Sequence, residues 1–332
     1  MVSLKGRRYS RSVGVSAHQS KLHRSGASKG VQETARSLAV DLVTAEVVSA
    51  FRERGVPSIL LKGPSIAIWL YRDGAPRPYG DSDLLVPPAQ AAHAQQVLLS
   101  LGFRYGYESL GPGVLADDLF WIRGRDTVDL HSTLHGVRAD PERVWRVLSE
   151  HTEVQKVAGQ GMNVLDPTAR AMHVALHAAH HGRREAVPMT DLARALELLP
   201  FAAWAQAGEL ATEIDAGAAF ATGLSLLPAG QAIVERLGME QDGSVNALLS
   251  AHTAPTVAFT LEELRKTAGP AAKARFVVRK AFPTRTYMRV YWPIARRGSA
   301  GLVVAYCQRI VHKMGKLLPA IIAWRRARRA SR

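Results

Sequence analysis

Apolar residues recur with a helical period near the start of the chain and then give way to short runs. Over 31–54 they return every three or four residues, which predicts an amphipathic helix. The run 58–61 has the length of a buried strand. Gly63-Pro64 then opens a helix that continues to residue 70, because proline suits the first turn of a helix. This order predicts a strand–turn–helix unit.

Strand-like runs continue to residue 165, and helical patterns dominate beyond it. The predicted fold class is therefore α/β (α+β), a mixed sheet with flanking helices followed by a helical domain. We divide the chain into a basic tail over 1–30 with the composition of a disordered segment, an α/β domain over 31–165, a helical domain over 166–250 and a basic C-terminal extension over 251–332. We predict strands at 81–86, 103–107, 119–122 and 127–131, a hairpin at 153–165, and helices at 89–101, 168–182, 188–199 and 215–237.

Charge is separated along the chain. Residues 1–30 contain seven Lys and Arg and residues 265–332 contain eighteen, and neither segment contains an acid. The remaining 18 basic residues, between 31 and 264, stand against all 28 acids, so this central part has a net charge of −10 although the whole chain has +15. The high overall basicity belongs to the two ends and not to the α/β domain.

The composition also bears on cellular location. No apolar run reaches the roughly eighteen residues of a membrane-spanning helix. The basic, serine-rich N-terminus lacks the apolar core of a secretory signal, although an organellar transit peptide would share its composition. Cys307 is the one cysteine, which excludes a disulfide within the chain and suits a reducing cytosol. We expect a cytoplasmic protein with no transmembrane segment, and peripheral membrane contact is left open.

Basic and apolar residues alternate in a helical pattern over 299–329. Three interpretations of this segment are open: packing on the acidic body, contact with an anionic membrane surface, and contact with nucleic acid. Pro319 is expected to kink any continuous helix here.

Carboxylates enter two of the predicted strands. Asp81 and Asp83 stand two apart at the start of one strand, so their side chains project to the same side. Such carboxylates repel each other, and Mg²⁺, or Mn²⁺ in its place, would compensate them while keeping positions for water and phosphate oxygens. Asp129 lies in another apolar strand, and strand pairing would bring it beside the first two to form a site for two metals. A turn-capping Asp81 and an exposed Asp129 are the plainer alternatives.

Three motifs together resemble the polymerase-beta-like nucleotidyltransferase superfamily, and in particular a poorly characterised bacterial branch of it. They are Leu60-Leu61-Lys62-Gly63, Gly80-Asp81-Ser82-Asp83-Leu84-Leu85-Val86 and Val128-Asp129-Leu130-His131, within a similarity that covers about residues 35–240. The resemblance implies a nucleotidyltransferase-type mixed sheet followed by a helical domain, with 31–165 as the catalytic domain. It also implies that the turn at Gly63 holds the NTP phosphates and that Asp81, Asp83 and Asp129 bind the metals.

The turn after the first strand departs from the Gly-Ser or Gly-Gly of that superfamily. It reads Gly63-Pro64-Ser65, and Pro64 has no N–H to donate to phosphate. Donors must therefore come from Ser65 and the next amides at the helix N-terminus. Lys62 and Arg77 are the nearest cations in the sequence, and we expect them to meet the triphosphate, Arg77 with the better geometry because its guanidinium is a planar fork. Solvated surface positions are the alternative for both.

His173, His177 and His181 recur at intervals of four and would share one face of a helix, with His180 beside them. Such a face can bind zinc, line a cleft towards nucleotide or acceptor, or pack in the interior.

These features predict an enzyme that moves an NMP from Mg-NTP to an unidentified acceptor by a two-metal mechanism, the acceptor being a small molecule, a peptide or a protein. The alternative is a non-catalytic nucleotide- or RNA-binding member of the same fold. The Gly63-Pro64-Ser65 turn favours this alternative, and the three retained carboxylates disfavour it. A metal-dependent hydrolase built on the histidine helix is a remoter option.

Overall fold

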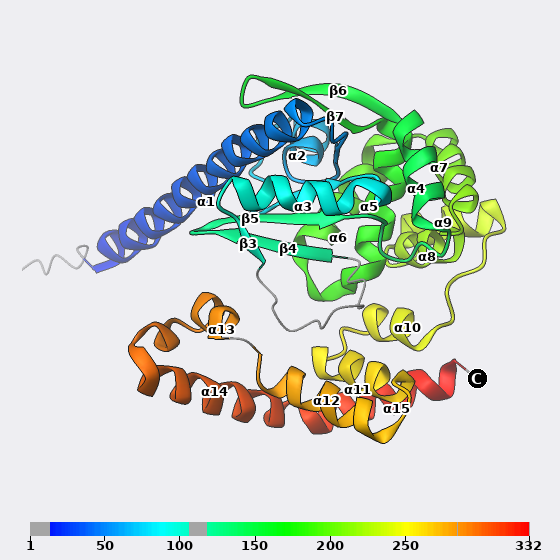
Figure 1. The fold of residues 1–332 in the computed structure, drawn as a ribbon. Helices are drawn as coiled ribbons and strands as arrows, with labels where there is room; N and C mark the ends of the chain where they lie inside the picture. The colour runs from blue at the N-terminus through cyan, green and yellow to red at the C-terminus, as the bar shows by residue number, and fades with distance from the viewer. Residues whose placement is uncertain (1–13, 106–117, 284, 332) are drawn as a thin grey trace, which may run out of the picture.

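A mixed seven-stranded sheet forms the centre of the molecule (Figure 1). The computed structural model describes residues 14–105, 118–283 and 285–331. The order across the sheet is β3–β4–β5–β2–β1–β7–β6, and the pairs β2–β5 and β1–β7 are parallel while the other pairs are antiparallel. The predicted mixed sheet is therefore confirmed. The strands are β1 (Ile59–Leu60), β2 (Ser82–Leu85), β3 (Arg104–Tyr105), β4 (Asp118–Arg123), β5 (Asp126–His131), β6 (Thr152–Val157) and β7 (Gln160–Leu165).

Helices cover both faces of the sheet and continue beyond it (Figure 1). They are α1 (Gly14–Glu53), α2 (Pro64–Leu70), α3 (Ala91–Ser100), α4 (Pro141–Glu150), α5 (Pro167–His181), α6 (Ala186–Leu198), α7 (Phe201–Glu213), α8 (Gly217–Leu224), α9 (Pro228–Leu237), α10 (Val245–Ala251), α11 (Thr256–Lys266), α12 (Pro270–Ala281), α13 (Arg285–Tyr291), α14 (Gly298–Gly315) and α15 (Leu317–Ala330). Short 3-10 turns are η1 (Pro88–Gln90), η2 (Gly182–Arg184) and η3 (Pro293–Arg296).

Helix α1 is longer than the predicted helix over 31–54. It begins at Gly14, so part of the segment predicted as a disordered tail is helical, and residues 1–13 lie outside the described part of the chain. No proline interrupts 14–53, which allows the helix to extend beyond its packed half. In that half Val47 and Phe51 are fully buried against the sheet.

Each face of the sheet has its own apolar core, because alternate residues of a strand point to opposite faces. Leu84 and Val128 pack with α1 and α3 on one face. Ile59 and Leu85 pack on the other face with α2, α4 and the helices that follow β7, including Trp204 of α7. The α/β and helical domains divided at 165/166 therefore share one continuous core.

The helical region departs from the prediction in two places. The segment 215–237 is two helices, α8 and α9, because Pro228 cannot continue a helix and instead begins the second one. Helix α7 fills 201–213, where none was predicted. Gly208 weakens the helical signal there, yet a larger residue would be tight, since an added Cβ would lie 3.3 Å from Met239 Sδ and 3.5 Å from the Phe220 ring.

The C-terminal extension forms a layer of helices below the sheet in the view of Figure 1. Helix α10 crosses the predicted 250/251 boundary, packs in one apolar cluster with α11 and α15, and is joined to α5 by a hydrogen bond from Ser250 Oγ to the His180 carbonyl (3.2 Å). The kink expected at Pro319 is a break at Lys316, since proline is tolerated in the first turn of α15. Within the described residues, no helix combines the length and the apolar character needed to cross a membrane.

Candidate active site

The acidic candidates meet where β2 and β5 run in parallel. Their register pairs Asp83 directly with Asp129, so both carboxylates project from the same face of the sheet. Asp81 immediately precedes β2 and lines the same cleft. The strand pairing expected to bring Asp129 beside the first aspartates is therefore observed.

A cleft of about 270 Å³ opens over this face of the sheet. One side is the turn between β1 and α2, and the other is formed by α5 and the start of α6. Ser65 is absent from its lining. The polar and charged side chains that line it are Lys62, Arg77, Tyr79, Asp81, Asp83, Asp129, His131, His135, His177, His180, His181 and Glu185.

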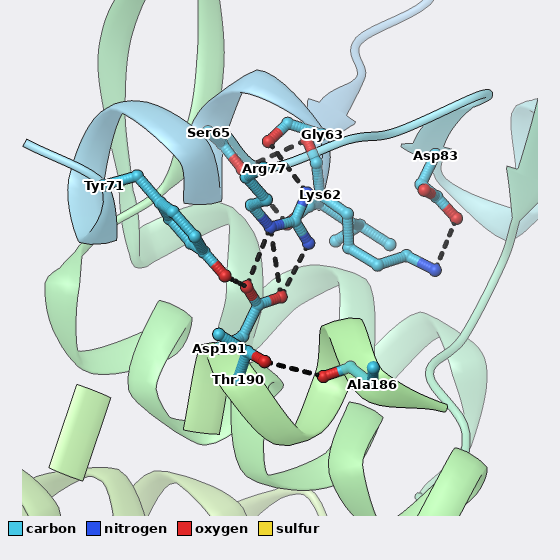
Figure 2. Close-up of polar contacts among 10 residues, drawn as sticks. Lys62, Gly63, Ser65, Tyr71, Arg77, Asp83, Ala186, Thr190 and Asp191 are labelled. Atoms are coloured by element: carbon cyan, nitrogen blue, oxygen red, sulfur yellow. Dashed lines mark hydrogen bonds and ion pairs between the residues drawn. The ribbon is translucent and has the colours of Figure 1, made fainter. Parts of the chain in front are cut away.

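Asp83 is buried and compensated. Its Oδ1 accepts from Lys62 Nζ at 2.7 Å, as Figure 2 shows, and lies 3.2 Å from His131 Nε2. Burial alone would raise the pKa of the Asp83 carboxyl, but the Lys62 charge and the His131 hydrogen bond outweigh it and hold that pKa well below the usual range. Burial alone would lower the pKa of the Lys62 ammonium. The charges of the surrounding carboxylates outweigh this effect, so the pKa of Lys62 is raised. Both groups are charged at neutral pH.

Asp129 and Asp81 are not compensated in this way. The Oδ1 atom of Asp129 is buried without a hydrogen-bond partner among the described residues. Burial, followed by the charges of Asp83 and Asp81, raises the pKa of Asp129 to about 7. Burial and the Asp83 charge raise the pKa of Asp81 as well. The site therefore holds more negative charge than Lys62 neutralises, which is the environment that a cation would stabilise.

The donor geometry fits a divalent cation. One ligand atom each from Asp83, Asp129 and His131 lie within 4.8 Å of one another. Carboxylate oxygens suit Mg²⁺ and Mn²⁺. His131, which was not among the predicted metal ligands, joins this grouping because it is two residues after Asp129 on the same face of β5. Asp81 is outside the grouping and influences it through its charge.

The Gly63 turn has a backbone that suits only glycine. Gly63 has φ 65° and ψ −121°, and an added Cβ would lie 3.4 Å from the Tyr79 ring. Ser65 Oγ donates to the carbonyls of Leu61 (3.2 Å) and Lys62 (3.3 Å), and the residue is fully buried. The Ser65 hydroxyl therefore closes the turn from within, and this geometry disfavours a phosphate contact by that hydroxyl.

Arg77 is also engaged inside the protein. Its guanidinium forms a two-pronged ion pair with Asp191 of α6, from Nη2 at 2.7 Å and from Nε at 2.9 Å (Figure 2). Its Nη1 donates to the Gly63 carbonyl at 3.3 Å, and Tyr71 Oη donates to the same Asp191 at 2.7 Å. Because these groups occupy the fork, the contacts favour a positioning role for Arg77 over the phosphate contact expected from the sequence.

Three histidines of α5 line the cleft. His177, His180 and His181 face it, and the rings of His135 and His180 stack with 3.7 Å between centroids. Burial lowers the pKa of His173 to about 3 and that of His177 well below its usual value. These helix histidines take no part in the metal-binding grouping found among the described residues, and so the geometry favours the cleft-lining interpretation over zinc.

Comparison with known proteins gives one broad match. Residues 17–229 match a protein family described as "Uncharacterised nucleotidyltransferase". No curated protein matches the chain significantly.

Several solved structures match part of this chain. The complex of ANT(2'')-Ia with adenylyl-2''-tobramycin is 16% identical, with 52% of this chain and 97% of that chain covered and a TM-score of 0.39. An antigenic nucleotidyltransferase-like protein from Paracoccidioides brasiliensis is 15% identical (61% and 93% covered, TM-score 0.38). The Megavirus polyadenylate synthase is 11% identical (59% and 40% covered, TM-score 0.35). All these TM-scores are below 0.5.

Proposed function

We propose that this chain, which belongs to the uncharacterised nucleotidyltransferase family, moves a nucleoside monophosphate from a metal-bound NTP to an acceptor. The observation that carries the proposal is the direct pairing of Asp83 with Asp129 across parallel strands, at the floor of a cleft. The unpartnered, buried Oδ1 of Asp129 supports it further, because a polar atom left in this state is costly unless a ligand satisfies it.

Asp83 and Asp129 would hold Mg²⁺ or Mn²⁺, and Asp81 would complete a second position beside them. When bound, the metals would neutralise the triphosphate and activate the acceptor. Lys62 supplies a permanent positive charge at the same place, since it is paired with Asp83 and raised in pKa by the carboxylates. His177, which burial keeps neutral, supplies a hydrogen-bonding group but no charge. Phosphate affinity therefore depends on Lys62, the metals and the Gly63 turn.

The chain's own residues also keep the turn in place. Arg77 binds the Gly63 carbonyl on one side and Asp191 of α6 on the other, so the β1–α2 turn is fastened to the helical domain. A triphosphate over Gly63 would meet a surface that is already fixed, which reduces the ordering cost of binding.

Transfer can be tested with each α-labelled NTP, Mg²⁺ or Mn²⁺, and a cell lysate as the source of acceptor. We expect the wild type to label an acceptor and Asp83→Asn/Asp129→Asn to lose at least about 100-fold of this activity. Glu150→Gln/Glu213→Gln, which removes two exposed acids elsewhere, is the matched control. Equal nucleotide binding by the wild type and the aspartate variant, without any transfer, would instead favour the non-catalytic binding alternative.

We also propose that the protein acts in the cytoplasm and that its basic C-terminal extension contacts an anionic membrane surface. Apolar side chains exposed on α14 beside lysines, in a segment without acids, support this contact over packing on the acidic body.

A further inference from the structure

A second and larger cleft, of about 1170 Å³, adjoins the aspartate cleft. Its walls come from three separate parts of the chain: the middle of α1 (residues 32–43), the β3–β4–β5 side of the sheet, and the α13–η3 segment of the C-terminal extension. Gly80 lines this larger cleft and the next residue, Asp81, lines the smaller one. The two clefts therefore lie next to each other at the start of β2.

The sheet register continues from the aspartates into the larger cleft. Phe120 of β4 is the direct partner of Asp129 on β5, and Asp129 is the direct partner of Asp83 on β2. Directly paired residues share a face of the sheet, so these side chains form a row across three strands. Phe120 lines the larger cleft. A molecule lying over Phe120 would have one end beside the metal-binding carboxylates.

The lining of the larger cleft is cationic although the body of the protein is acidic. Among the described residues that line it, the one acid is Asp126, which is already paired with Arg123 at 3.1 Å. Aromatic rings of Tyr105, Phe120 and Tyr291 lie among the charges. Its arginines are Arg36, Arg104, Arg125, Arg289 and Arg296.

Guanidinium groups and aromatic rings in one cleft define the chemistry of a ligand. Arginine forks bind phosphate with two hydrogen bonds each, and flat apolar groups stack on aromatic rings and on guanidinium planes. The volume is somewhat above the usual range of small-molecule sites, so the cleft has room for one phosphorylated compound of moderate size.

We propose that this cleft binds the acceptor, and that the acceptor is a small molecule with a phosphate group and a flat apolar part. The inference rests on the proposed transfer function. An acceptor hydroxyl oxygen forms a new bond to the α-phosphorus of the NTP, and the bond from that phosphorus to the bridging oxygen breaks. Pyrophosphate leaves with the bonding electrons, and the hydroxyl proton passes to solvent. The larger cleft holds the acceptor's phosphate away from the reacting oxygen.

Binding can be tested without any reaction by using riboflavin 5′-phosphate as a fluorescent probe, riboflavin as its uncharged counterpart, and EDTA to remove metals. The cleft variant is Arg125→Gln/Arg289→Gln, which changes exposed arginines on opposite walls. Arg143→Gln/Arg326→Gln is the matched control, with exposed arginines outside the cleft. We expect the wild type to bind the phosphate probe more tightly than riboflavin, the cleft variant to weaken it at least tenfold, and the control to stay within twofold. Equal binding by both variants, or no preference for the phosphate, would overturn the proposal.

A second experiment repeats the transfer assay with α-labelled NTP in a lysate and then separates small molecules, RNA and protein to locate the label. We expect the label among small anionic molecules, with the cleft variant raising the KM for this acceptor fraction at least tenfold while the KM for NTP stays within twofold. Label in RNA or protein would overturn the small-acceptor proposal and leave transfer intact. Absence of transfer by the wild type, with probe binding still dependent on the cleft arginines, would overturn the proposed function and the acceptor role and leave an anion-binding site.

Discussion

Asp129 makes the free energy of unfolding depend on pH. Its pKa is raised to about 7 from the usual 3.8, so the folded protein holds this proton more tightly than the unfolded chain. The folded state therefore loses stability as pH rises from 4 towards 7, and the loss is complete above pH 7. Without metal, Asp129→Asn is expected to raise the free energy of unfolding by about 4 kcal/mol at pH 8 and by little at pH 4. Urea denaturation in EDTA at both pH values measures this; the same change at both would contradict it.

Metal affinity should depend on the same Asp129 carboxyl group, but it should increase with pH where the stability of the metal-free protein decreases. A cation needs the ionised form of Asp129, so protons compete with it below the pKa of about 7. We expect the affinity for Mn²⁺ or Mg²⁺ to fall by up to about tenfold per pH unit below 7 and to level off above it. Calorimetric titration from pH 5.5 to 8.5 checks the slope. Asp83→Asn should remove the binding at every pH, and binding that is flat across the range would argue against Asp129 as a ligand.

At the scale of elements, the buried Arg77–Asp191 pair fastens the β1–α2 turn to α6. Asp191→Asn leaves the guanidinium buried without its counter-charge, and we expect a loss of about 3 kcal/mol in the free energy of unfolding. The KM for NTP should rise as well, because the Gly63 turn loses an anchor. Asp73→Asn, which breaks the exposed pair with Arg194, is the matched control and should change neither quantity appreciably. Equal effects of the two substitutions on urea denaturation would refute the positioning role.

Helices and strands were predictable where the local sequence carries a clear pattern. The strand around Asp83 and the strand around Asp129 are short apolar runs bounded by turn residues, and both occur at the expected positions. Helix α7 was missed because Gly208 interrupts its signal, and its need for glycine comes from packing against Phe220 of another helix. The shared core across 165/166 was equally hidden, since it depends on how α5 to α8 fold back on the sheet.

The candidate site was predictable to the same extent. The aspartates and Gly63 belong to contiguous motifs, and the structure brings them to one cleft. Arg77 and Asp191 are 114 residues apart, and nothing in the sequence links them. The larger cleft combines arginines from positions 36 to 296, each of which is an ordinary surface residue when considered alone. Contacts of this kind follow from the tertiary fold, and local sequence patterns do not predict them.

At the scale of the whole molecule, the C-terminal extension presents apolar groups to solvent. Val311, Met314 and Leu318 are 72%, 61% and 69% exposed, and Lys313 and Lys316 lie between them in a segment without acids. We expect the protein to co-sediment with vesicles containing phosphatidylserine, and the bound fraction to fall with added salt and with neutral phosphatidylcholine alone.

The two variants that test this prediction each replace two exposed apolar side chains with serine. Val311→Ser/Met314→Ser should weaken vesicle binding at least fivefold, because burial of these side chains in the interface contributes to it. Val154→Ser/Leu198→Ser removes exposed apolar groups from the acidic body and should leave binding unchanged. Binding that RNA abolishes, or that both variants retain, would point away from a membrane surface.

The position of the cleft wall near the end of the chain has a consequence for biosynthesis. The aspartate-bearing strands and the core beneath them are complete once α9 has left the ribosome, whereas Arg289, Tyr291 and Arg296 follow more than fifty residues later. On the proposed assignment, a nascent chain can retain a nucleotide before it can retain an acceptor. A message that stops between α9 and α13 would thus yield a protein with the machinery of transfer but without its choice of recipient, and quality control that removes such fragments would protect the cell from misdirected nucleotidylation.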